Sequence, residues 1–351
     1  MIVSVAWGLG FLIAAAVLVR LLRGIAVRKA LLDVPNERSS HKVPVPRLGG
    51  AAFVPLLLGA LGFWADAARV PEALRWAVVG GAAAMYVVSL VDDVFTLSTG
   101  IRFAVQFTAA GAVLATAANT WPATNAVWPW MPVQPPGLGY WVLCLWIVGL
   151  LNIYNFMDGI DGIAGFQTVV AGLGWWWIGT EHGAAFVAGT GLIAAATAAG
   201  FLTQNWPPAK IFMGDAGSTV LGFFFATLPL VAAVETKGTL RLEVLLMAAV
   251  LIVWPFLADG TFTILRRLKN RENIFRAHRS HLYQRLVIAG KSHRLVTVVY
   301  GVLAAIGAGL GWSVVSGLPY AIFVAVGVVA GLFIALWQWT VVTEQEYLDR
   351  K

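Results

Sequence analysis

The sequence has few charged residues and a single cysteine, and both shortages limit what the protein can be. Only 12% of its 351 residues are Asp, Glu, Lys or Arg, whereas 59% are hydrophobic, and the mean hydropathy is +0.80. Soluble globular domains carry about 25% charged residues, so this composition excludes one. Cys144 has no partner, which excludes an internal disulfide. The chain also lacks internal repeats, low-complexity tracts and Pro/Gly/Ser linkers, which indicates one membrane domain over residues 1–351.

Long apolar runs take the place of the missing charges. A helix of about 17 to 25 apolar residues can cross the hydrocarbon core of a bilayer. Eleven such segments are predicted, at residues 3–19, 48–65, 73–91, 101–119, 138–151, 164–180, 184–203, 217–234, 243–265, 296–312 and 318–341. No positive residue precedes the first run, so it is predicted to be a retained anchor, not a cleaved signal peptide. The sequence therefore predicts an all-α, polytopic integral membrane protein with about eleven transmembrane helices.

The positions of Lys and Arg predict the orientation in the membrane. Short cytoplasmic loops are rich in these two residues. With eleven spans and the N-terminus outside, the inside loops and the C-terminal end hold 20 of the 24 basic residues. Only Arg69, Arg75, Lys237 and Arg241 fall outside. The C-terminus is thus predicted inside, and the net charge of +7 indicates anionic lipid or phosphate partners, not nucleic acid.

The same topology places the polar clusters of the chain on the cytoplasmic face. They lie in a loop around His41 and Arg47, at Asp92-Asp93, in the stretch Asn152-Ile-Tyr-Asn155-Phe-Met-Asp158-Gly-Ile-Asp161-Gly, between Asn205 and Ser218 with Asp215, and around His278, Arg279 and His281. Ionisable groups near a bilayer are costly and usually mark function. Several loops meeting on one face favour an active site over a conduit through the membrane.

Each cluster taken alone also has a plainer interpretation. Two adjacent acids such as Asp92-Asp93 are commonly solvated, and the acids of the Asp158 loop could form a turn or begin a helix. That loop lacks the closing Glu of a calcium site, and the glycine-rich start at Gly214 lacks the Gly-Lys-Ser/Thr of a nucleotide P-loop. For His278 and His281, each taken alone, a solvated position in a loop is the favoured interpretation. For Asp259, inside the ninth predicted helix, an ion pair with Arg266 is the favoured interpretation.

Together the clusters indicate phosphate chemistry. Carboxylate oxygens are hard ligands that suit Mg²⁺, which usually binds through few protein carboxylates and additional phosphate oxygens. Basic residues and a glycine-rich helix start suit phosphate groups. Phosphoryl transfer needs mainly in-line positioning and charge neutralisation, which these residue types supply.

Three ordered motifs resemble those of the polyprenyl-phosphate N-acetylhexosamine-1-phosphate transferases, glycosyltransferase family 4, over about residues 33–286. They are Asp92-Asp93, Asn155-x-x-Asp158-Gly-x-Asp161-Gly and Phe212-Met-Gly-Asp215-x-Gly-Ser218. His41 with Pro46-Arg47-x-Gly-Gly50 resembles a further motif of the family, its first cytoplasmic one. These enzymes start bacterial cell-wall and O-antigen glycans at the cytoplasmic face of the inner membrane.

The resemblance implies attack by the phosphate of undecaprenyl phosphate on a UDP-N-acetylhexosamine, which releases UMP. It implies Mg²⁺, with Mn²⁺ as an alternative, held by Asp215 and Asp93. The implied catalytic residues are Asp92, Asp93 and His281. In some assignments Asp92 acts as a base. The implied substrate-binding residues are His41, Arg47, Asn152, Asn155, Asp158, Asp161, Asn205 and Arg279. A homodimer is compatible with the sequence.

The histidine motif departs from the family pattern. Relatives carry a His-x-His-His cluster, of which His281 alone remains, with Tyr283 and Gln284 at the other positions. This variant is similar to the O-antigen branch that transfers N-acetylfucosamine 1-phosphate or related 6-deoxy sugars. Two other functions remain open: a transporter for a phosphorylated or nucleotide-linked solute, and a lipid-diphosphate phosphatase. Transporters commonly show repeat symmetry and sites at the bilayer midplane.

Overall fold

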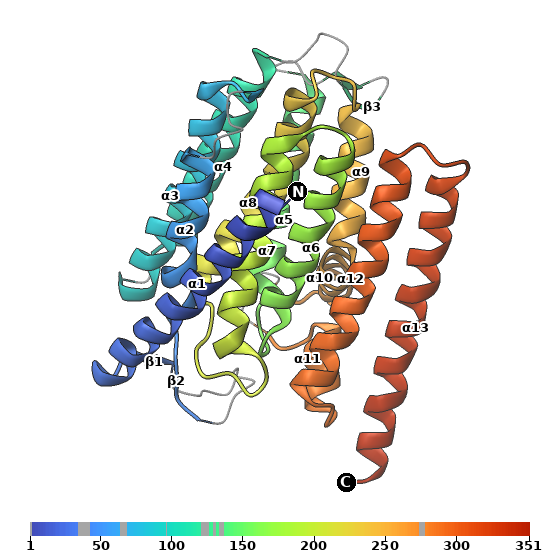
Figure 1. The fold of residues 1–351 in the computed structure, drawn as a ribbon. Coiled ribbons are helices and arrows are strands. Elements are labelled where there is room, and N and C mark those ends of the chain that lie inside the picture. Colours follow the sequence, from blue (N-terminus) through green and yellow to red (C-terminus); the bar gives the residue numbers. More distant parts are fainter. Residues whose placement is uncertain are drawn as a thin grey trace.

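The computed structural model describes residues 2–33, 43–63, 69–95, 97–120, 126–128, 131–132, 137–273 and 278–351 (Figure 1). For residues 2–5, 93, 94, 126–128 and 132 it describes the backbone alone. Two residues predicted for the site are affected. His41 and the side chain of Asp93 lie outside the described residues.

Helices make up almost all of the described structure. Thirteen occur in it: α1 (Ile2–Arg28), α2 (Gly49–Phe63), α3 (Glu72–Phe95), α4 (Thr99–Ala118), α5 (Leu138–Phe156), α6 (Ile163–Glu181), α7 (Ala185–Asn205), α8 (Asp215–Glu235), α9 (Leu242–Ile252), α10 (Trp254–Lys269), α11 (Leu282–Ile288), α12 (His293–Val315) and α13 (Ala321–Asp349). Two short antiparallel hairpins join β1 (Leu32–Asp33) to β2 (Val45–Pro46) and β3 (Ala126–Trp128) to β4 (Met131–Pro132).

Every predicted apolar segment falls on a helix, so the expected all-α polytopic membrane fold is confirmed. Within the described residues, eight helices are long and apolar enough to cross a membrane: α1, α3, α4, α5, α7, α8, α12 and α13. The bent pair α9 and α10 makes a ninth if it counts as one span. The two predicted segments outside this set are α2, which has only 15 residues, and α6.

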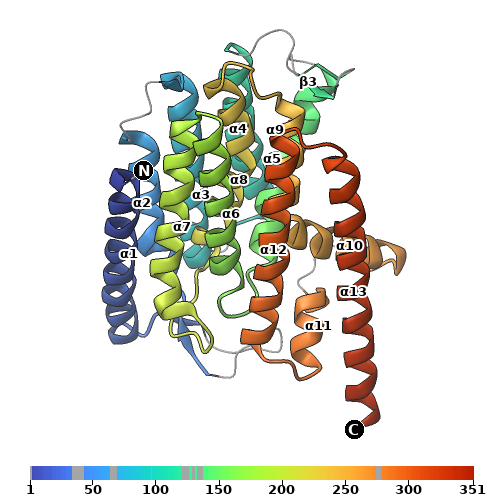
Figure 2. The ribbon, with the colours of Figure 1, turned by 45° about the vertical axis from the view of Figure 1, so that its right-hand side comes forward.

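The ninth predicted segment is not one straight helix, and that part of the prediction is wrong. The chain bends by 78° between α9 and α10, so that α10 runs across the neighbouring helices (Figure 2). Pro255 has no backbone N–H and favours the first turn of a new helix, which explains the break. The carbonyl of Ile252, freed at the bend, accepts a hydrogen bond of 3.0 Å from the buried amide of Gln167. Asp259 thereby lies on a helix that crosses the bundle.

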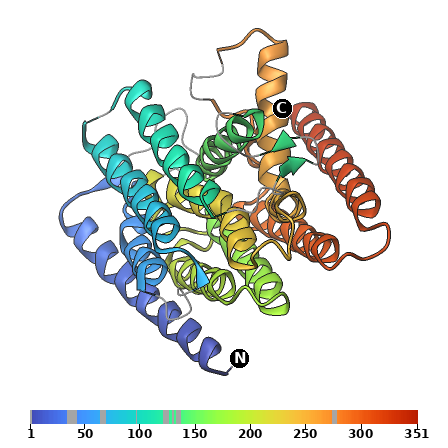
Figure 3. The same ribbon diagram turned by 90° about the horizontal axis from the view of Figure 1, so that it is seen from above.

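Helix α8 forms the centre of the bundle and positions the start of the fourth polar loop (Figure 3). All residues of its membrane-spanning window are buried. Glycine allows the close approach of α5, because a Cβ on Gly222 would stand 2.6 Å from the Cα of Leu151. Helices α1 and α13, by contrast, have only 17% of their windows buried and present apolar side chains outward, as lipid contact requires. The first residue of α8 is Asp215, so this acid is fixed by the most buried helix.

Candidate active site

Backbone hydrogen bonds dock the first polar loop onto the fourth. The N–H of Phe212 donates to the carbonyl of Pro46 at 2.8 Å. The N–H groups of Gly49 and Gly50 donate to the carbonyls of Phe212 and Met213 at 2.8 and 2.7 Å. Two segments more than 160 positions apart in the sequence are therefore held in a fixed register at the start of α8.

This docking brings Arg47 to Asp215. The guanidinium Nη2 of Arg47 lies 3.3 Å from the carboxylate Oδ1 of Asp215, and the two side chains are 42% and 32% exposed. Gly214 has a φ of +75°, and a Cβ at this position would stand 2.9 Å from the carbonyl oxygen of Arg47. Only glycine fits both constraints easily. The result is an accessible ion pair at the positive end of the α8 dipole.

The last turn of α5 and the loop after it add Asn155 and Asp158 to the same place. The side-chain amide of Asn155 donates to the hydroxyl of Ser218, in the first turn of α8, at 3.0 Å. Burial raises the pKa of Asp158 well above its ordinary value, and the negative charges of Asp215 and Asp161 raise it further, whereas Arg47 opposes them. Three carboxylates and one guanidinium therefore interact electrostatically at this end of the bundle.

Asp161 and Asn205 connect this loop to the segment that follows α7. The carboxylate Oδ2 of Asp161 accepts a hydrogen bond from the N–H of Ala209 at 3.0 Å and lies 3.3 Å from Nδ1 of His293. The buried Asn205 accepts from the N–H of Gly162 at 2.9 Å and donates to the carbonyl of Ile211 at 2.8 Å. Both ends of the Asn205 amide thus bind backbone groups, which suits holding the two loops together.

The other predicted residues near α3 and α4 are engaged in local contacts. The carboxylate of Asp92 pairs with Arg102 at 3.0 Å and accepts from the N–H of Leu97 at 2.6 Å. The side-chain amide of Asn152 donates to Oε1 of Gln106 at 2.8 Å, which ties α5 to α4. The sequence did not single out Gln106. Its side-chain amide within a mostly apolar helix is the signal that could have marked it.

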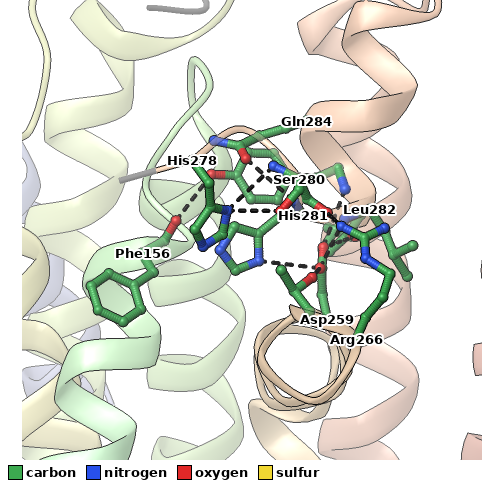
Figure 4. A network of polar contacts seen from close by, with 11 residues as sticks. Phe156, Asp259, Arg266, His278, Ser280, His281, Leu282 and Gln284 are labelled. Carbon is green, nitrogen blue, oxygen red and sulfur yellow. Dashed lines mark hydrogen bonds and ion pairs between the residues drawn. The ribbon is translucent and has the colours of Figure 1, made fainter. Parts of the chain in front are cut away.

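The histidine loop is organised by Asp259. Nδ1 of His281 lies 3.3 Å from Oδ1 of Asp259, and both side chains are buried (Figure 4). The expected ion pair between Asp259 and Arg266 is wrong, because Arg266 donates instead to the carbonyl of Ser280 at 2.5 Å. A charged residue within an apolar helix was the signal in the sequence, but the bend before α10 could not be foreseen from it.

Tyr283 connects the histidine loop to the Asp158 loop. Its hydroxyl donates to the carbonyl of Phe156 at 3.0 Å, and a Cβ on Gly159 would stand only 2.1 Å from that hydroxyl. Burial, followed by the charges of Asp259 and Asp158, raises the pKa of the Tyr283 phenol well above 10.0, and Arg279 acts in the opposite direction. Arg279 and Asp158 therefore both lie within electrostatic range of Tyr283.

Gln284 also serves the local structure. Its Oε1 accepts a hydrogen bond from the N–H of His281 at 3.3 Å, which closes the capping box at the start of α11. Tyr283 and Gln284 are both buried. Any influence of these two residues on sugar choice would therefore act through the Asp158 loop that they support.

The donor atoms of the site suit a hard cation. Within the described residues no group of three or more His, Cys, Asp or Glu side chains is arranged to hold a metal ion. Burial is the main cause of the raised pKa of Asp158, and the nearby carboxylates of Asp215 and Asp161 add to it while Arg47 opposes them. Carboxylate oxygens that repel one another fit Mg²⁺, which takes a few protein carboxylates and completes its shell with water and phosphate oxygens.

Comparison with known proteins gives one matching family and several relatives. The family model described as glycosyl transferase family 4 matches residues 75–233. A decaprenyl-phosphate N-acetylglucosaminephosphotransferase of Mycobacterium tuberculosis is 30% identical over 79% of this chain and 74% of its own length. A probable undecaprenyl-phosphate N-acetylglucosaminyl 1-phosphate transferase of Bacillus subtilis is 29% identical over 82% and 79%. An undecaprenyl-phosphate alpha-N-acetylglucosaminyl 1-phosphate transferase of Escherichia coli O157:H7 is 28% identical over 81% and 78%.

Proposed function

Since the chain belongs to glycosyl transferase family 4, the polyprenyl-phosphate N-acetylhexosamine-1-phosphate transferases, we propose that it transfers N-acetylhexosamine 1-phosphate from a UDP-sugar to undecaprenyl phosphate. A terminal oxygen of the lipid phosphate attacks the sugar-bearing phosphorus. The bond from that phosphorus to the bridging oxygen breaks, and UMP leaves with the bridging oxygen. The products are UMP and a lipid-linked diphosphate sugar.

The observation that carries this proposal is the convergence of Arg47, Asp158 and Asp215 at the start of α8. Arg47 lies 3.3 Å from Asp215, and burial together with the charges of Asp215 and Asp161 raises the pKa of Asp158. A diphosphate is the kind of ligand that needs both a guanidinium and carboxylates that hold a cation. The exposed fractions of Arg47 and Asp215 leave the pair accessible to such a ligand.

Mg²⁺, or Mn²⁺ in its place, would be held by Asp215 and Asp93 and supplies charge neutralisation to the diphosphate when bound. The chain's own groups then bind and orient the substrates. Arg47 binds a phosphate of the donor, and Asn155 and Asp158 hold the nucleotide-sugar side. The contacts of Asn205 and Asp161 support a positioning role, since both join the two loops that carry this side.

The remaining residues are assigned to the acceptor and to the sugar. Asp92 and Asp93 stand at the end of α3 and serve the lipid phosphate, with Asp92 oriented by Arg102. A phosphate monoester has its second pKa near about 6, so the acceptor is largely ionised at neutral pH and a base contributes little. His281 is assigned to the diphosphate as a catalytic residue. His41, Asn152 and Arg279 complete the proposed set of substrate-binding residues.

The donor is proposed to be a UDP-N-acetylhexosamine at the cytoplasmic face of a bacterial inner membrane, and the product a starting unit for O-antigen or a related glycan. The names of the three relatives above specify N-acetylglucosamine. Tyr283 and Gln284 in the histidine motif favour a 6-deoxy sugar such as N-acetylfucosamine. The initial rates with UDP-N-acetylglucosamine, UDP-N-acetylfucosamine and UDP-N-acetylquinovosamine decide whether the donor carries N-acetylglucosamine or a 6-deoxy sugar.

Release of UMP tests the reaction. Protein purified in detergent is incubated with each substrate alone and with both together. We expect UMP only when both are present, and none after chelation of divalent metal. UMP without the lipid would indicate hydrolysis, release of inorganic phosphate from a lipid diphosphate would indicate a phosphatase, and uptake into vesicles without UMP would indicate a transporter.

A further inference from the structure

Asp259 is a buried acid that the proposed reaction does not yet use. It lies on α10, has no exposed surface, and is the meeting point of five hydrogen bonds (Figure 4). Oδ1 accepts from Nδ1 of His281 at 3.3 Å, from the N–H of Leu282 at 2.9 Å and from the hydroxyl of Thr263 at 3.2 Å. Oδ2 accepts from the N–H of Tyr283 at 3.1 Å and from the hydroxyl of Tyr300 at 2.6 Å.

A buried carboxylate is stable only when hydrogen bonds replace its lost hydration. A purely structural role would be satisfied by the two backbone N–H groups at the start of α11 together with Tyr300. The additional bond to His281 is unusual because that imidazole is itself 3% exposed and is the single histidine left from the family's cluster. The bond to Asp259 engages Nδ1, so Nε2 is the ring nitrogen that this bond leaves for another partner.

We propose that Asp259 is a positioning residue for sugar-phosphate transfer and acts by fixing the tautomer and orientation of His281. This inference rests on the function proposed above. A neutral imidazole carries one proton, and an ionised carboxylate can only accept. The bond at Nδ1 therefore places that proton on Nδ1 and leaves Nε2 as the nitrogen that can meet a substrate or its proton.

The same carboxylate also sets where the ring lies. Asp259 holds the N–H groups of Leu282 and Tyr283, so the start of α11 and the His281 ring are fixed to α10 by one group. The His281 ring stacks on the Tyr283 ring, with centroids 5.6 Å apart and planes inclined by 21°. Tyr283 in turn bonds Phe156 beside the Asp158 loop. The path from Asp259 to the proposed donor site thus runs through direct contacts.

The loss of activity that follows removal of an orienting carboxylate is known from other histidine sites. Removing the partner of a metal-bound histidine costs about 10- to 100-fold, and a wrong tautomer in a Ser-His-Asp triad costs about 10⁴-fold in kcat. We therefore expect Asp259→Asn to lower kcat by at least about 10-fold, with a smaller change in KM for the UDP-sugar. Tyr300→Phe is the matched control, because it removes a bond to Oδ2 and leaves the Oδ1 bond to His281 in place.

A double-variant cycle separates positioning from general damage. If Asp259 acts through His281, the Asp259→Asn, His281→Gln double variant should have the same kcat as His281→Gln alone, within about twofold. A double variant slower by the product of the two single effects would overturn the proposal. Elution volume and melting temperature of each variant show whether it is folded.

¹⁵N NMR of protein labelled with ¹⁵N-histidine tests the tautomer of His281 without substrate. The His281 signals are assigned by their loss in His281→Gln and recorded at alkaline pH, where the rings are neutral. We expect the Nδ1–H tautomer in the native protein and in Tyr300→Phe, and a mixture or the Nε2–H tautomer in Asp259→Asn. Nε2–H in the native protein would overturn the proposal even if Asp259→Asn did not fold. Because the tautomer of His281 is measured without turnover, its result does not depend on the outcome of the transferase assay.

Discussion

The close packing around Gly159 predicts how far a larger residue at this position would lower turnover and stability. A Cβ at this position would stand 2.1 Å from the Tyr283 hydroxyl, 3.1 Å from Cζ of Tyr283 and 3.1 Å from Nε2 of Gln284. Gly159→Ala must therefore push Tyr283 away from Phe156 or move the Asp158 loop. Forcing an extra methyl into a packed site typically costs about 1 to 3 kcal/mol. A displacement of about 1 Å at a reacting geometry can cost about 10²-fold in rate.

We expect Gly159→Ala to lower UMP formation on the order of 100-fold and to lower the melting temperature. The decisive test is a suppressor. Tyr283→Phe removes the oxygen that causes the worst overlap, so Gly159→Ala should be milder in the Tyr283→Phe background than in the native protein. Tyr283→Phe alone gives up one hydrogen bond, worth about 0.5 to 1.5 kcal/mol.

Gly149→Ala is the control, because it lies on the neighbouring α5 and a Cβ there meets nothing within 4 Å. Its turnover and melting temperature should match those of the native protein. Native turnover of Gly159→Ala would show that the site accommodates the extra methyl group without displacing Tyr283. An effect of Gly159→Ala that stays unchanged after removal of the Tyr283 hydroxyl would show that this oxygen is not its cause.

Further predictions concern the carboxylates and the orientation of the chain. Asp215→Asn and Asp93→Asn should each abolish nearly all UMP release in folded protein across a Mg²⁺ titration; native rates at saturating Mg²⁺ would count against both as metal ligands. Asp158 has a raised pKa in the fold, so its ionisation destabilises the metal-free protein as the pH rises above about 4. Asp158→Asn should therefore melt at a higher temperature than the native protein at neutral pH without Mg²⁺, with the gap closing toward pH 4, and a lower melting temperature would contradict this. Reporter fusions should place the N-terminus in the periplasm and the 97–98 turn in the cytoplasm; the reverse would invalidate the proposed cytoplasmic site.

The positions of the helices could be predicted from the sequence because apolar runs of membrane-spanning length are a strong signal. Each of the eleven predicted segments contains helix, including α2 and α6. The 78° bend at Val253 was missed, since Pro255 alone does not distinguish a kink from the start of a new helix. The apolar composition on both sides of the bend gave no further clue.

The site was predictable as a set of loops but not as a set of contacts. The motifs containing Asp158 and Asp215 were recognised, and the structure brings these two acids within electrostatic range of Arg47. Their supporting partners were not foreseen. His293 and Ala209 bind Asp161, and Asp259 binds His281, through contacts more than 20 positions apart in the sequence. Pairings of this kind depend on how helices pack, which a single sequence does not reveal.

In the proposed reaction a sugar phosphate, and not the sugar alone, moves to the lipid. The most direct measurement uses a UDP-N-acetylhexosamine labelled at the sugar-bearing phosphorus, purified protein, Mg²⁺ and undecaprenyl phosphate. The label should appear in the lipid fraction in a one-to-one ratio with UMP in the aqueous fraction, and Asp215→Asn should abolish both. Label that stays in the aqueous fraction as UDP, or is released as sugar phosphate without entering lipid, would contradict the account.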